Sequence, residues 1–63
     1  MSELNVNANI TGVDDFYAEL LAIHEHKSKT ESDAINARLI LLLANHIGDR
    51  EVLSEAMQKA EKL

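Results

Sequence analysis

The side chains of this chain best suited to chemistry are those of its three histidines, of Arg38 and of Asn45. Histidines bind metal ions and titrate near neutral pH, while an arginine beside an amide can hold a carboxylate. His24 and His26 are two residues apart, which places them on different sides of a helix and prevents joint ligation. Because the chain has no cysteine and no recognisable ligand motif, we expect no metal site and no cofactor.

His24 and His46 each lie at the centre of an apolar helical face, near the C-terminal end of a predicted helix. In an antiparallel hairpin they would be about 18 Å apart along the helix axes, so one chain cannot bring both to one ion. The simpler interpretation is a half-buried ring that packs on leucines and bonds a terminal carbonyl. The alternative is a titrating switch, since the helix end favours the charged ring while burial opposes it. The sequence leaves the protonation of both histidines open.

Arg38 and Asn45 are seven residues apart, so they share one strip of a helix beside apolar residues. With His46 they could form a small-molecule or metal pocket between helices or subunits, or hold an acidic residue of a partner. The simpler interpretation is a polar seam, in which Arg38 pairs with Glu19 or Glu31 and Asn45 sets the register of a dimer.

Helical periodicity identifies the elements that position these residues. The sequence predicts an irregular arm over residues 1–10 and one helical domain over 11–63, with helices at about 13–27, 31–47 and 50–62. Thr11 and Asp49 are expected as N-caps, and Gly48 as the left-handed residue that ends the second helix. The short connection after residue 27 predicts an antiparallel hairpin, with the third helix beside it.

The second helix carries five aliphatic residues in a row, Leu39 to Leu43, which point to every side of it. A chain of 63 residues buries only about 60% of its unfolded surface and is marginal alone. With no cysteine for disulfides, a second protein chain is the expected supplement. We therefore predict an all-α fold that packs as a dimeric helical bundle. The interface is expected to consist of Leu39, Leu41, Leu42, Leu43, Ile47, Leu53 and Met57.

Composition excludes several classes of function. The net charge of −5 and the pI near 4.9 disfavour nucleic acid and anionic membranes as partners. The longest apolar run, residues 39–44, is too short to span a bilayer, and no secretory signal is seen, so we expect a cytoplasmic protein. No phosphate-binding glycine loop and no cysteine nucleophile is present, and the serines lack evident triad partners. We expect no enzyme activity.

Two segments carry a family resemblance. The stretch from Phe16 to Leu21, together with the stretch from Asn36 to Asp49 and the Val52-Leu53 pair that follows it, resembles a family of short bacterial proteins of unknown function. The resemblance implies at most an accessory role beside flavin-dependent aromatic hydroxylases and assigns no catalytic residue. The sequence thus favours a non-catalytic homo-oligomeric interaction module, with an oxidoreductase as a further partner. The alternative is the binding protein that uses Arg38, Asn45 and His46.

Overall fold

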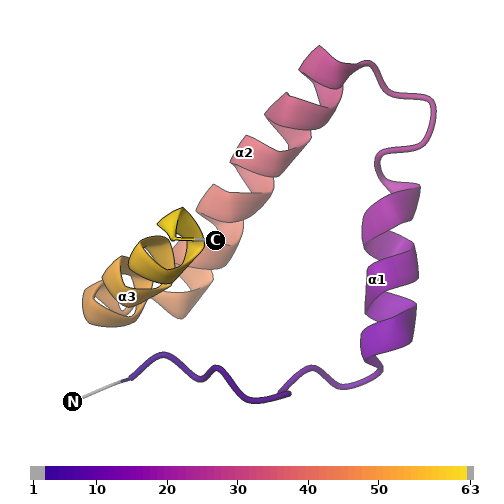
Figure 1. Ribbon diagram of the computed structural model, residues 1–63. Coiled ribbons are helices and arrows are strands. Elements are labelled where there is room, and N and C mark those ends of the chain that lie inside the picture. The colour runs from indigo at the N-terminus through magenta and orange to yellow at the C-terminus, as the bar shows by residue number, and fades with distance from the viewer. Residues whose placement is uncertain (1–2, 63) are drawn as a thin grey trace.

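The computed structural model describes residues 3–62 and confirms the all-α prediction. Its three helices are α1 (Val13–Ala22), α2 (Lys29–Ile47) and α3 (Arg50–Glu61), and no strand occurs within residues 3–62. Residues 3–10 form an irregular arm before α1, as expected for this part of the predicted arm (Figure 1). Residues 1–2 of that arm, and residue 63 of the predicted domain, lie outside the described residues.

The ends of α2 follow from its capping residues. Ser28 is the N-cap: its Oγ accepts from the Glu31 N–H at 3.1 Å, and its own N–H donates to Glu31 Oε1 at 2.8 Å. This capping box starts the helix at Lys29, two residues before the predicted start. The hydrogen bonds from Ser28 to the Glu31 carboxylate hold the pKa of that group below its ordinary value. At the other end, Gly48 has φ 71° and ends the helix, as predicted.

Helix α1 is shorter than predicted. It begins at Val13, but the N-cap is Gly12 at φ 62° and makes no side-chain cap, so Thr11 does not cap it. It ends at Ala22 rather than near residue 27, and residues 23–26 continue as hydrogen-bonded turns. The physical reason is His26, whose φ of 60° is left-handed and stops helical propagation before the cap of α2.

Helix α3 begins where the sequence places it. Asp49 is the N-cap, and its Oδ1 accepts from the N–H groups of Glu51 and Val52 at 3.0 and 3.2 Å. The helix ends at Glu61, within one residue of the prediction. Because only Gly48 and Asp49 separate α2 from α3, the chain changes direction sharply between them, and the two helices line one apolar hollow (Figure 1).

The helices enclose an opening instead of a core. Helices α1 and α2 diverge from the turn at residues 23–28, so the expected hairpin is not closed by packing (Figure 1). The arm runs from α1 towards α3, where the Leu4 N–H donates to Glu55 Oε1 at 3.3 Å. The radius of gyration is 13.5 Å, against about 10.6 Å for a compact chain of this length. No described residue is fully buried.

Candidate functional site

An apolar groove with a volume of about 520 Å³ lies between α2 and α3. We call it the α2–α3 groove. Its lining residues are Ile40, Leu41, Leu43, Ala44 and Ile47 from α2, and Arg50, Leu53, Ala56, Met57 and Ala60 from α3. Arg50 is the one charged residue among them. An apolar hollow with a single charge at its edge suits hydrophobic side chains better than a polar ligand.

The groove is open to solvent. Leu41 is 69% exposed, Ile40 64% and Met57 62%, although all three belong to one continuous surface. Single exposed apolar side chains are ordinary, but a contiguous apolar surface marks an interaction site. The groove is a contiguous exposed apolar surface of this kind.

Five of the seven predicted interface residues line the groove. They are Leu41, Leu43, Ile47, Leu53 and Met57. Leu39 and Leu42 lie outside it: at 100° per residue, Leu42 is about 170° from the centre of the groove side of α2. Leu39 is half-buried, whereas Leu42 is 69% exposed. The run of five aliphatic residues thus supplies two different sides of α2.

The polar residues singled out from the sequence lie away from the groove. Arg38, Asn45 and His46 are all exposed, and helical geometry places each about 130° to 150° from the groove centre. The expected pairing of Arg38 with Glu19 or Glu31 is not formed. The ion pair found within residues 3–62 joins Lys29 and Asp33 at 3.0 Å. Arg38 and Asn45 share one strip, but the structure does not assemble a pocket around them.

His24 has a structural contact that the sequence did not suggest. It is half-buried, and its Nδ1 lies 3.0 Å from Ser32 Oγ, which links the turn at residues 23–28 to the first turns of α2. The expected carbonyl partner is thus replaced by a hydroxyl eight residues further along the chain. The pairing joins two segments across a turn, so helical spacing alone gave no signal for it.

The histidines do not converge. Ser32 and His46 are fourteen residues apart on α2, so about 21 Å of helix separates the hydroxyl beside His24 from His46. His46 is exposed at the last turn of α2, in contrast to the half-buried ring expected there. Within residues 3–62, no group of three or more His, Cys, Asp or Glu side chains is placed to hold a metal ion.

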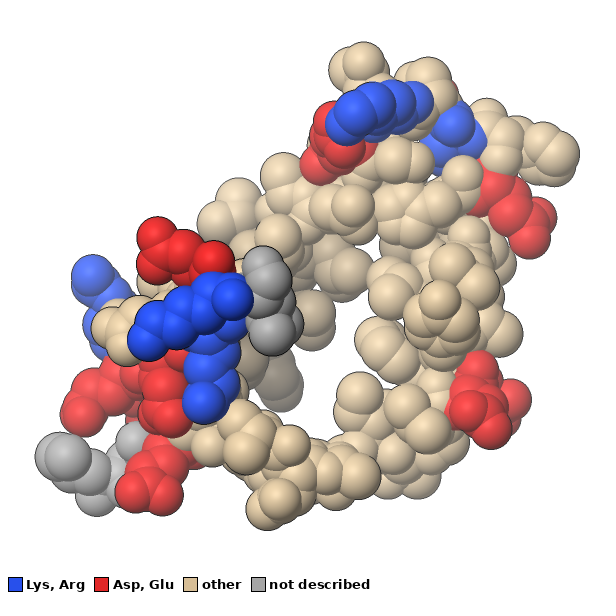
Figure 2. Space-filling view, in the orientation of Figure 1, with Lys and Arg blue, Asp and Glu red and all other residues tan. Residues whose placement is uncertain are grey.

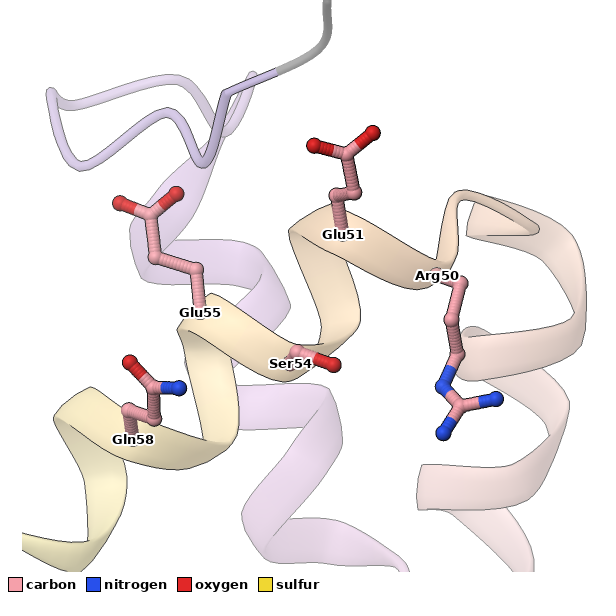
Figure 3. Close-up of a pocket in the computed structure, with 5 residues that line it drawn as sticks. All are labelled: Arg50, Glu51, Ser54, Glu55 and Gln58. Atoms are coloured by element: carbon pink, nitrogen blue, oxygen red, sulfur yellow. The ribbon is translucent and has the colours of Figure 1, made fainter.

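A second hollow lies on α3 alone and has a volume of about 450 Å³. Figure 3 shows its residues, Arg50, Glu51, Ser54, Glu55 and Gln58, leaving one helix in diverging directions. One of these residues, Glu55, already accepts from the Leu4 N–H of the N-terminal arm. Convergent polar groups, which define a ligand site, are missing from it.

Comparison with known proteins identifies a family for this chain. A family model described as "Protein of unknown function (DUF2783)" matches residues 4–62. No curated protein and no solved structure matches the chain. In the described part of the chain, no helix has the length and apolarity needed to cross a membrane.

Proposed function

We propose that this chain, which belongs to the DUF2783 family of proteins of unknown function, is a non-catalytic interaction module that binds a second copy of itself through the α2–α3 groove. The observation that carries the proposal is the exposed area of the single chain, 5799 Å². A compact monomer of 7.0 kDa exposes about 4,000 Å². The excess of roughly 1,800 Å² is surface that a folded monomer would have covered.

The same scaling gives the area available to a dimer. Two separate copies expose about 11,600 Å², whereas a compact protein of twice the mass exposes about 6,700 Å². Pairing could therefore remove up to roughly 4,900 Å² from water, within the range of obligate homodimers. That area is an upper bound, because the dimer need not reach full compactness. It is nevertheless well above the roughly 1,200 Å² at which stable interfaces begin.

Two other functions were expected from the sequence, and neither gains a specific supporting observation. The small-molecule or metal pocket requires Arg38, Asn45 and His46 to surround a cavity, and these side chains are exposed on the side of α2 away from the groove. An oxidoreductase partner rests on the family resemblance alone. We therefore limit the proposal to self-association, for which the groove and the exposed area provide the support.

Sedimentation equilibrium of the purified chain tests the proposal. We expect a mass near twice 7.0 kDa at micromolar concentration and a thermal midpoint that rises with protein concentration, because association stabilises the folded state by mass action. A folded, monodisperse monomer whose midpoint is independent of concentration would overturn self-association. A folded chain is recognised by its far-ultraviolet helical signal in the same samples.

A further inference from the structure

We infer that helix α1 of a second copy occupies the α2–α3 groove, in a reciprocal exchange that places two α1 helices in two grooves. The inference rests on the proposed self-association and names the segment that fills the interface. In this arrangement, Phe16 and Tyr17 are the side chains that enter the apolar groove of the partner.

The α1 helix of the same chain does not reach its own groove. Its ten residues extend about 15 Å, whereas the nineteen residues of α2 extend about 28 Å. Laid antiparallel on α2 from the turn, α1 would cover residues 29–38. The groove begins at Ile40 and continues onto α3, so α1 laid on its own α2 stops short of the groove.

The turn between α1 and α2 holds α1 away from α2. The Ser28–Glu31 capping box fixes one end of the turn, and the contact of His24 Nδ1 with Ser32 Oγ at 3.0 Å ties its middle to α2. The backbone bonds from His24 N–H to Leu21 and from Glu25 N–H to Ala22 continue the order into α1. Helix α1 is thus presented with its apolar side uncovered, which is the geometry that an exchanged helix needs.

The shapes of helix and groove are complementary. Phe16 and Tyr17 are the only aromatic residues of the chain, and they are 43% and 59% exposed on α1. The groove offers small residues, Ala44, Ala56 and Ala60, among its larger aliphatic ones. Large aromatic side chains that enter pockets are the usual anchors of an interface. Pairing one groove against another would instead bring two hollow surfaces together.

The charges are complementary as well. Helix α1 carries Asp14, Asp15 and Glu19 and no basic residue, whereas the charged residue lining the groove is Arg50. Residues 34–47 of α2 contain no acidic residue, and their single arginine, Arg38, lies on the side away from the groove. Figure 2 shows uncharged side chains around the opening, with the charged ones gathered at the outer corners of the molecule. An acidic helix with an apolar side fits such a surface without burying like charges together.

Cysteine cross-linking tests the inference, since the chain contains no cysteine of its own. Tyr17→Cys and Met57→Cys variants, one of them labelled with ¹⁵N, are refolded together from denaturant and oxidised. We expect a disulfide-linked pair of one labelled and one unlabelled chain, formed at least about tenfold faster than in two controls. The controls are Ala18→Cys with Met57→Cys, and Tyr17→Cys with Gln58→Cys, because Ala18 and Gln58 lie about 130° to 140° from the apolar sides of their helices.

The outcomes separate the inference from the proposed self-association. A dimer in which Met57→Cys links mainly to itself would show groove-to-groove pairing and would overturn the inference alone. A dimer in which the test pair links no faster than the controls would do the same. A folded monomer would overturn both. Should a variant fail to fold, nuclear Overhauser effects are measured in a mixed sample of labelled and unlabelled wild-type chains. We expect contacts across chains between the Tyr17 ring and the Met57 methyl group. Contacts confined within one chain would refute the exchange of α1.

Discussion

Leu41 and Leu42 provide a matched pair of substitutions that locates the interface on one side of α2. Both side chains are 69% exposed, both lie in the same turn, and both lose the same atoms on replacement by alanine. Only Leu41 lines the α2–α3 groove. We predict that Leu41→Ala weakens self-association strongly and that Leu42→Ala leaves it nearly unchanged.

The size of the effect follows from the exposed fraction. Full burial of a leucine contributes about 1.5–3 kcal/mol, so burying the 69% that Leu41 exposes contributes about 1–2 kcal/mol per chain. A symmetric dimer buries the residue twice, which gives about 2–4 kcal/mol, or an increase in Kd of roughly 30- to 900-fold. Leu42→Ala removes no groove contact, and an effect within about 0.5 kcal/mol is expected.

Sedimentation equilibrium over a range of chain concentrations gives Kd for the wild type and both variants, with the helical signal recorded on the same samples. If the isolated monomer is not folded, the concentration dependence of the unfolding midpoint gives the same comparison. An interface on the groove side of α2 is refuted if Leu42→Ala raises Kd as much as Leu41→Ala does. It is also refuted if Leu41→Ala changes Kd by less than about threefold in a folded dimer, since its burial would then contribute almost nothing.

Three further predictions concern the helix ends, each measured at a fixed chain concentration. The lowered pKa of Glu31 means that its contribution to stability is present above the ordinary value of 4.5 and is lost as the pH falls through the lower folded value. The helical signal of the wild type should therefore fall more than that of Glu31→Gln on acidification below that value, and equal losses would contradict the capping role. Gly48→Ala should lower the free energy of urea unfolding by about 1–2 kcal/mol, because φ at this position is 71°. The added Cβ has room, since its neighbour is Asn45 O at 3.7 Å, so an unchanged midpoint would argue against the left-handed conformation. Asp49→Ala should cost about 1 kcal/mol and Asp49→Asn much less, and equal losses would show that the charge matters more than the cap.

The sequence predicted the helices better than their packing. Asp49 and Gly48 are local signals, since an N-cap and a left-handed glycine act within one turn, and both behave in the structure as expected. The end of α1 was predicted too late because the apolar spacing continues through His24 while the backbone already leaves the helix. His26 gives no warning in the sequence, since left-handed histidines are uncommon.

The candidate site was only partly accessible from the sequence. The periodicity of α2 and α3 identified Leu41, Leu43 and Met57, but it could not divide the leucine run between two sides without knowing where α3 lies. Likewise, the contact of His24 with Ser32 depends on how the turn folds, which local propensity does not determine. Helix spacing predicts which sides of α1 and α2 are apolar but not what covers them, so it gave no signal that the two helices would diverge from the turn and leave the hairpin open.

The division of α2 into two sides also changes the meaning of the polar residues. In the sequence, Arg38 and Asn45 interrupt an apolar segment and therefore look like a site embedded in a core. In the structure they lie on the side opposite to the groove and remain exposed. If α1 of a second copy fills the groove, these residues stay in solvent on the outside of the pair, where a fixed cation and an amide are available to an acidic group of another molecule. Under the proposed self-association, substitutions of Arg38 or Asn45 should therefore leave pairing intact, because these residues lie outside the groove.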